Sequence, residues 1–158
     1  MVIVADSSAL IALSICHQLN LLENLFDEVH VPASVYREVN VPNKPESKQL
    51  IEFLKDKKMD IELSSYIIST PRLGKGELEA MALYKKLNAD YLLTDDKQAR
   101  KTAEYNNIKI IGSIGILILA KRQGLIQAVK PSLDAIYHSY TYISEALYQH
   151  VLEVVNER

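Results

Sequence analysis

Residues 1–13, with the sequence MVIVADSSALIAL, decide the fold. Residues 2–5 form a short apolar run rich in β-branched side chains, which is typical of a buried strand. The run stops at Asp6 and at two serines, Ser7 and Ser8, either of which suits a helix N-cap, and a helical apolar pattern follows at once. A strand that leads directly into a helix indicates an open α/β sheet. Asp6 then lies at the carboxyl end of the first strand, the edge where such sheets bind ligands.

Length and charge exclude several classes of protein. The 158 residues suit a single domain, 1–158, that buries about two-thirds of its unfolded surface. Eighteen basic and twenty acidic residues give a net charge of −2, which excludes a nucleic-acid binder held by bulk positive charge alone. A net charge of −2 is still compatible with a local basic patch. The lone Cys16 cannot form an internal disulfide, so we expect a reducing compartment and a buried apolar role for its side chain.

No segment has the pattern of a targeting signal or a membrane span. The N-terminal apolar run has no basic start and reaches an acid at position 6, unlike a signal peptide. The longest later apolar run, residues 114–120, is too short to cross a bilayer. We therefore expect a cytoplasmic protein with no membrane partner.

Strand-like and helix-like segments alternate along the chain. Further strands are expected at residues 28–31, 60–64, 91–93 and 108–111. Helices are expected at 19–26, 32–39, 46–57, 77–88, 97–106, 112–124, 132–138 and 144–156, and residues 69–76 are expected to form a loop. Residues 112–124 suit a strand by propensity, but Ser113 as N-cap and Gly124 as stop favour a helix. The alternation predicts a parallel sheet covered on both faces.

Acidic residues stand at several strand-to-helix junctions and in one helix start. They are Asp6, Glu38, Glu77, Glu79, Asp95 and Asp96. Each alone suits a structural role, because Asp is a common N-cap and Glu in a first helical turn complements the helix dipole. Together, however, the carboxyl ends of parallel strands would bring them into one crevice.

Clustered carboxylates raise one another's pKa unless a cation lies between them. Mg²⁺ and Mn²⁺ prefer oxygen ligands of this kind, and such ions support phosphodiester or phosphoryl transfer. The acidic pattern therefore indicates a divalent-metal site.

The order of these acids resembles that of PIN domains, the metal-dependent ribonucleases that include VapC-type toxins. The matching motifs are DSSALIAL at 6–13, PASVYREV at 32–39, GELEA at 76–80 and TDD at 94–96. A less characterised PIN-like branch also shares GSIG at 112–115 and AKRQGLI at 120–126. The resemblance covers about residues 2–126, which gives a core at about 1–126 and a helical extension at about 127–158.

The resemblance implies a three-layer α/β/α sandwich with a short parallel sheet, bound Mg²⁺ or Mn²⁺, and hydrolysis of RNA. Asp6 then corresponds to the first metal ligand and Glu38 to the second acid. The third acid is Glu77 or Glu79, which point different ways on a helix, and the spacing to Thr94 favours Glu77. Asp95 and Asp96 supply the remaining positions.

Other side chains are candidates for supporting roles. Ser7 and Thr94 can donate hydrogen bonds to the ligand carboxylates or cap helices. Candidates to hold RNA phosphates are Arg72, Lys75, Lys97, Arg100 and Lys101, although such residues commonly form a solvated face. The tail is crowded with Tyr137, Tyr140, Tyr142 and Tyr148, which suit an interface or core better than base stacking.

We therefore expect a metal-dependent ribonuclease, either the toxin of a toxin–antitoxin pair or a stand-alone enzyme. The third acid is Glu where toxins usually have Asp, and KQAR follows Asp96 without their usual Asp-Phe. The expected partners are RNA, an antitoxin if the chain is a toxin, and a second copy of the chain contacting through the tail.

Two other classes of protein are alternatives to the ribonuclease hypothesis. One is an inactive PIN-like module that binds nucleic acid or protein. The other is a receiver-type phosphoacceptor, which is disfavoured because receivers pair acids after the first strand, where this chain has Asp6 alone.

Overall fold

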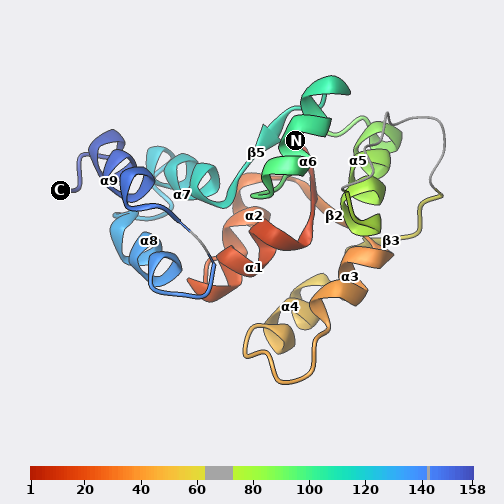
Figure 1. The fold of residues 1–158 in the computed structure, drawn as a ribbon, viewed down its shortest axis with the longest axis horizontal. Coiled ribbons are helices and arrows are strands. Elements are labelled where there is room, and N and C mark those ends of the chain that lie inside the picture. The colour runs from red at the N-terminus through yellow and green to blue at the C-terminus, as the bar shows by residue number, and fades with distance from the viewer. Residues whose placement is uncertain (63–72, 142) are drawn as a thin grey trace.

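Strand β1, Val2–Ala5, lies at the centre of the sheet in the computed structural model, which describes residues 1–62, 73–141 and 143–158. Within these residues five parallel strands have the order β3-β2-β1-β4-β5 (Figure 1). The other strands are β2 Glu28–Pro32, β3 Lys58–Met59, β4 Tyr91–Leu93 and β5 Ile110–Ile111. The helices are α1 Ser7–Ile15, α2 Asn20–Leu25, α3 Ala33–Val39, α4 Ser47–Leu54, α5 Lys75–Leu87, α6 Lys97–Tyr105, α7 Ser113–Arg122, α8 Lys130–Tyr137 and α9 Glu145–Val154.

The strand order creates a topological switch point between β1 and β4. From β1 the chain adds β2 and β3 on one side of the sheet, and it then returns to add β4 and β5 on the other side. Ala5 at the end of β1 lies opposite Leu93 at the end of β4. Asp6 and Thr94 follow these two residues, so the fold places them where open α/β sheets bind ligands.

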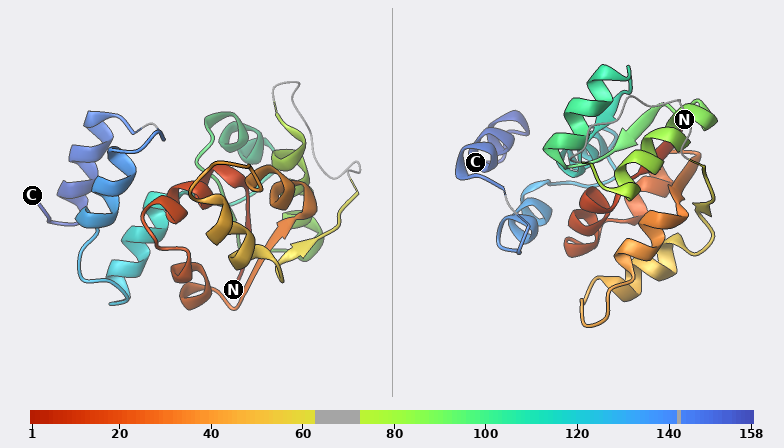
Figure 2. Two further views of the ribbon diagram at one scale, coloured as in Figure 1. Left: turned by 90° about the horizontal axis from the view of Figure 1, so that it is seen from below. Right: turned by 45° about the vertical axis from the view of Figure 1, so that its right-hand side comes forward.

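The two faces of the sheet bury alternate residues of β1. Ile3 and Ala5 belong to a large apolar core with side chains of α1, α2 and α7, whereas Val4 belongs to a smaller core with α5 and α6. Helices enclose the strands from both sides (Figure 2). The predicted three-layer α/β/α sandwich with a short parallel sheet is therefore confirmed.

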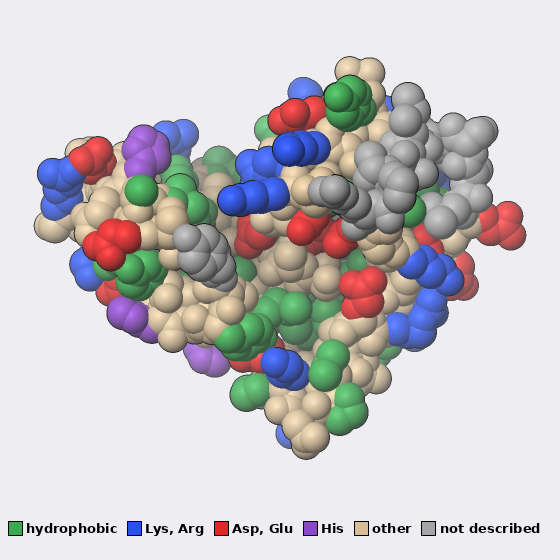
Figure 3. All heavy atoms as spheres, in the orientation of Figure 1, with side chains coloured by type: hydrophobic (Ala, Val, Ile, Leu, Met, Phe, Trp, Pro, Cys, Tyr) green, Lys and Arg blue, Asp and Glu red, His purple; other side chains and the backbone are tan. Residues whose placement is uncertain are grey.

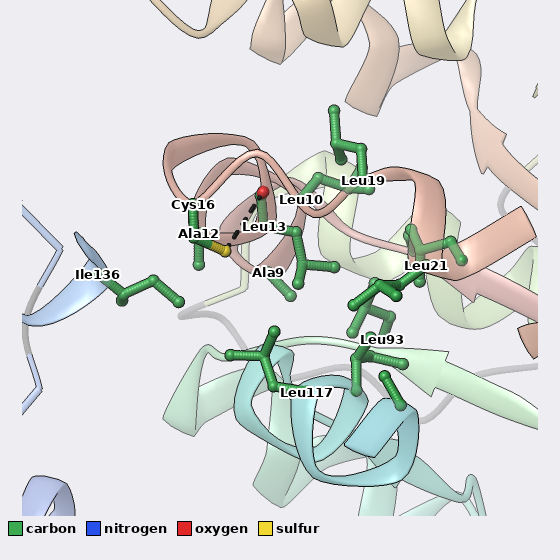
Figure 4. Close-up of a cluster of buried hydrophobic side chains, with 14 of the residues drawn as sticks. Ala9, Leu10, Ala12, Leu13, Cys16, Leu19, Leu21, Leu93, Leu117 and Ile136 are labelled. Carbon is green, nitrogen blue, oxygen red and sulfur yellow. Dashed lines mark hydrogen bonds between the residues drawn. The ribbon is translucent and has the colours of Figure 1, made fainter. Parts of the chain in front are cut away.

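Helix α1 packs against neighbouring helices on several sides, and apolar side chains around most of its circumference make these contacts. Leu10 and Leu13 are fully buried, and Figure 4 shows them packed among the side chains of neighbouring elements. Cys16 lies in this core, where its Sγ donates a hydrogen bond to the carbonyl oxygen of Leu13 at 3.5 Å. Burial raises the pKa of the Cys16 thiol to about 11, which fits the expected apolar role.

Several predicted element bounds are wrong. The third strand was expected at 60–64, but β3 is Lys58–Met59, which pairs with Val31 and Pro32 directly after the α4 turn. Residues 60–62 are not in a strand, and 63–64 lie outside the described residues. Helix α4 ends at Leu54 instead of 57. Lys75 and Gly76, expected in a loop, belong to α5 because the Glu77 side chain accepts from Gly74 N–H and caps the helix there.

The predicted serine N-caps are also wrong. Asp6 is the N-cap of α1, because its carboxylate accepts from Ser8 N–H, so Ser7 and Ser8 are already helical. Gly112 is the N-cap of α7, and Ser113 is its first residue. In both helices an aspartate carboxylate, and not a serine hydroxyl, accepts a hydrogen bond from an N–H group of the first turn. The hydroxyls of Ser8 and Ser113 instead donate to Asp6 and Asp95.

The tail packs on α1 and α7, and the partly buried carboxylate of Glu157 lies near its end. Gln18 Nε2 at the end of α1 donates to Ser132 Oγ of α8 at 3.2 Å. Glu157 accepts hydrogen bonds from Lys121 Nζ at 2.7 Å and from the N–H groups of Val129 and Lys130, each at 2.8 Å. These bonds tie the end of the chain to the junction of α7 and α8, at the end of the molecule remote from α5 (Figures 1 and 2).

Two tail tyrosines have structural contacts. The rings of Tyr137 and Tyr148 lie 4.5 Å apart, and Tyr148 OH donates to Asp134. Tyr142 lies outside the described residues. No helix in the described ranges is both long enough and apolar enough to cross a membrane.

Replacing Glu157 by Ala should destabilise the protein by about 2–3 kcal/mol, because two backbone N–H groups and the Lys121 ammonium lose a charged acceptor that is only 12% exposed. The matched control is Glu153→Ala, which removes an ion pair with Arg158 at a site 51% exposed and should cost under about 1 kcal/mol. Urea unfolding measures both. Equal effects of the two substitutions would contradict the assigned role of Glu157.

Candidate acidic site

Asp6 is the most enclosed carboxylate of the site, with a residue exposure of 2%. Its Oδ1 accepts hydrogen bonds from Ser8 N–H at 3.1 Å and from Ser8 Oγ at 2.7 Å. Its Oδ2 accepts a hydrogen bond from Thr94 Oγ1, at the end of β4. Asp6 therefore joins the β1–α1 junction to the β4–α6 junction across the switch point.

The backbone fixes the direction of these hydroxyl bonds. Ser8 Oγ accepts a hydrogen bond from Asp95 N–H at 2.9 Å, and Thr94 Oγ1 accepts one from Asp96 N–H at 3.2 Å. A hydroxyl group has one proton to donate, and both protons are used on Asp6. Because both oxygens of Asp6 serve as acceptors, the network favours its ionised form.

Burial and neighbouring charge oppose that ionised form. Desolvation raises the pKa of Asp6 to about 7, against the lowering effect of the bonds from Thr94 and Ser8. The negative charges of Glu77 and Asp95 raise the pKa further. A cation beside Asp6 would relieve both unfavourable effects, because it would stabilise the carboxylate that the hydroxyls already orient.

The two aspartates after β4 have different partners. Asp95 is exposed, and its two oxygens accept from Ser113 N–H at 2.8 Å and Ser113 Oγ at 2.7 Å, so it binds the start of α7. Gly112 permits this contact, since a Cβ there would lie 2.8 Å from Asp95 Oδ1. Asp96 caps α6, because its Oδ2 accepts from Ala99 N–H at 2.8 Å.

Glu38 and Glu77 approach the site from helices α3 and α5. Ser7 Oγ donates to Glu38 Oε2 at 3.0 Å. The Glu38 carboxylate lies against Gly76, where a Cβ would lie 2.1 Å from Glu38 Oε1 and would displace that carboxylate. Burial raises the pKa of Glu77, and the charges of Asp96 and Glu38 raise it further, so Glu77 lies in the electrostatic field of the cluster.

Glu79 lies on another face of α5 from Glu77, as their spacing predicts. It is 5% exposed, and its Oε1 lies 3.7 Å from Lys75 Nζ, with no hydrogen bond to Oε1 in the described part of the chain. Lys75, expected to bind phosphate, thus has a carboxylate neighbour within its own helix. The electrostatic coupling to Asp6 involves Glu77, which supports Glu77 as the third acid.

The donor set has the chemistry that a hard divalent ion requires. Asp6 Oδ2, Glu77 Oε2 and both oxygens of Asp95 each accept one hydrogen bond from the described residues, which leaves a lone pair on each. Across residues 1–62, 73–141 and 143–158, no three His, Cys, Asp or Glu side chains are close enough to coordinate one ion. The carboxylates fit a metal by type and by charge.

The basic candidates of α6 line one side of the acids. Figure 3 shows basic side chains over α6, with acidic side chains gathered directly beneath them. Lys97, Arg100 and Lys101 are exposed, and Arg100 Nη2 donates to the carbonyl oxygen of Thr94 at 3.5 Å. Arg72 lies outside the described residues.

Sequence reasoning missed two serines of the site. Ser8 and Ser113 were interpreted as helix caps, yet Ser8 orients Asp6 and Ser113 holds Asp95. Their positions in the sequence could have indicated this role, because Ser8 lies two residues after Asp6 and Ser113 lies two residues after the end of β5. The expected supporting contacts of Ser7 and Thr94 to carboxylates are present.

Comparison with known families agrees with this geometry. The family model DUF3368, described as a PIN domain, matches residues 2–157. The chain belongs to the PIN-domain family. The match includes the tail helices α8 and α9 as well as the sheet. No curated protein matches the sequence. PIN domains are generally nucleases that use divalent metals, so the acidic site of this PIN domain lies on a nuclease-type fold.

The raised pKa of Asp6 predicts a distinct pH dependence of stability in EDTA. Unfolded Asp6 ionises near 3.8 and folded Asp6 near 7, so between these pH values the folded protein retains a proton that the unfolded chain has lost. Stability should fall as pH rises through this window. Asp6→Asn should remove that contribution, so that the variant's melting temperature gains about 10 °C on the wild type between pH 4 and 8.

Exposed Asp60 provides the matched control, and Asp60→Asn should follow the wild-type curve. Thermal unfolding monitored by circular dichroism measures all three proteins. A wild-type curve parallel to that of Asp6→Asn would show that Asp6 is ionised at low pH despite its burial.

Proposed function

We propose that the protein is a Mg²⁺- or Mn²⁺-dependent ribonuclease whose catalytic acids are Asp6, Glu38, Glu77, Asp95 and Asp96. The observation that supports this most strongly is the position of Asp6. A nearly inaccessible carboxylate lies at the switch point of a PIN domain, is oriented by two hydroxyl donors, and is repelled by two further acids. A structural N-cap alone does not need this burial or these neighbours.

Asp6, Glu77 and Asp95 are the proposed metal-holding residues, with Glu38 and Asp96 beside them. A bound divalent ion would supply activation of a water molecule and stabilisation of negative charge on the phosphate. The serines and the threonine of the site have a positioning role. Ser8 and Thr94 hold both oxygens of Asp6, and Ser113 holds both oxygens of Asp95, so these two carboxylates keep their orientation before any ligand arrives.

Helix α6 supplies the proposed phosphate contacts. Asp96 caps this helix, and Lys97, Arg100 and Lys101 follow within its first turns. Their charges lie beside the acids, where they can hold the phosphates that flank a scissile bond while the carboxylates remain free for the ion. This arrangement provides the local basic patch that the net charge of −2 permits.

The test is cleavage of a mixed RNA pool with Mn²⁺ or with EDTA, comparing the wild type with Asp6→Asn. We expect cleavage by the wild type only with Mn²⁺, and a loss of at least about 100-fold in Asp6→Asn, because the removed charge acts directly on the reaction. RNA binding without cleavage by either protein would favour the alternative, an inactive PIN-like module. Cleavage that survives in Asp6→Asn would place the activity elsewhere.

The pair Glu77→Gln and Glu79→Gln tests which glutamate is the third acid. Both changes keep the size of the side chain and remove one charge on the same helix. Mn²⁺ should raise the melting temperature of the wild type and of Glu79→Gln, and should raise that of Glu77→Gln much less, because the charge of Glu77 raises the pKa of Asp6 whereas Glu79 lies beside Lys75. The opposite order would assign the role to Glu79.

A further inference from the structure

Tyr140 is an exposed aromatic side chain that the fold holds in one orientation. It is 59% exposed and lies just beyond α8. Lys44 Nζ lies 4.6 Å from the centre of its ring, and Tyr140 OH donates to Glu46 Oε2 at 3.2 Å. These contacts come from residues about ninety positions earlier in the chain, before α4. Lys44 covers one face of the ring, and more than half of the Tyr140 surface is exposed.

Helix α1 connects this ring with the acidic site. Its first residue, Ser7, donates to Glu38, and its last turn contacts α4 through the bond from Gln49 Nε2 to the carbonyl oxygen of Ser14 at 3.3 Å. Glu46, which binds Tyr140, directly precedes α4. Nine residues of helix separate the two ends by about 13 Å.

The outward stripe of α1 is apolar along this path. Ser7, Ile11 and Ile15 recur every four residues, so they share one face, and all three are partly exposed. In Figure 3 the acidic side chains lie at the upper end of a hollow, and apolar side chains line its lower part, over α1 and α4. Apolar parts of a ligand could therefore pack on the surface between the acids and Tyr140.

Charge favours a polyanion as the occupant. Lys97 and Lys101 lie exposed on α6, and Lys44 lies exposed over the Tyr140 ring, whose hydroxyl neutralises part of the Glu46 charge by donating to it. A single-stranded nucleic acid combines regularly spaced negative charges with planar apolar bases, and it binds proteins through basic side chains and stacked aromatic rings. A ring that is already oriented loses little conformational entropy when a base stacks on it.

We propose that Tyr140, backed by Lys44, is a stacking platform for a base of single-stranded RNA that extends from the acidic site along α1. This inference rests on the proposed ribonuclease function and adds a specific substrate contact outside the acids. Tyr140 binds a nucleotide remote from the scissile bond, so it determines the length and affinity of the bound strand.

The experiment measures the affinity of labelled oligouridylates of about 2 to about 10 nucleotides by fluorescence anisotropy, in the full chain with Asp6→Asn as background to prevent cleavage. Affinity should rise once the strand is long enough to reach Tyr140. Adding Tyr140→Ala should remove that rise, an effect of about fivefold or more, and leave the shortest oligonucleotides unaffected. Tyr140→Phe should retain most of the rise, because the ring and Lys44 remain.

Tyr105 gives the matched control, since it is 78% exposed on α6 and Tyr105→Ala should bind like the background protein at every length. If Tyr140→Ala also binds like the background at every length, the platform is excluded while RNA binding at the acids stands. If the background protein and the wild type in EDTA bind no oligonucleotide, the proposed function fails and the platform fails with it.

Discussion

The hydrogen bonds from Ser8 and Thr94 to Asp6 are the interaction on which the rest of the site depends. They join two chain segments almost ninety residues apart, at the point where the sheet reverses its order. Backbone N–H groups of Asp95 and Asp96 occupy the lone pairs of the same hydroxyls, so the following acids are placed by the bonds that orient the first. The price of this arrangement is a buried carboxylate with a pKa near 7, which is the condition a bound cation would relieve.

Helix caps and site residues coincide in this protein. Asp6 caps α1, Asp96 caps α6, and Glu77 completes the cap of α5, while Asp95 binds the first residue of α7. The structural roles expected of Asp and Glu at helix starts are therefore confirmed for Asp6, Asp96 and Glu77. Four helices begin around one point, and their positive ends help the protein tolerate several carboxylates close together. The same geometry suits a site that must hold both acids and an anionic phosphate.

The sheet and most helices could be predicted from sequence because their signals are local. The β-branched run before Asp6, the charges at both ends of α5, and Asn88 at its left-handed stop with φ 50° each act within a few residues. The bounds of β3 could not be predicted, since they depend on pairing with the end of β2. The cap of α1 could not be decided from sequence, because Asp6, Ser7 and Ser8 all suit an N-cap.

The acids could be found from sequence, but their relationships could not. Glu77 and Glu79 are nearly equivalent in the sequence. The packing of α5 against α3 separates Glu77, whose charge raises the pKa of Asp6, from Glu79, which lies beside Lys75. The sequence does not distinguish Tyr140 from the other tail tyrosines, because its contacts with Lys44 and Glu46 join residues far apart in the chain.

The central claim is that Asp6 is a preoriented carboxylate held for a cation. The most direct test is an NMR titration of the Asp6 carboxyl carbon, assigned by comparison with Asp6→Asn, without and with saturating Mg²⁺. We expect a pKa near 7 in the metal-free protein and a fall of at least about two units with Mg²⁺. A pKa near 3.8 that is the same with and without the ion would contradict it.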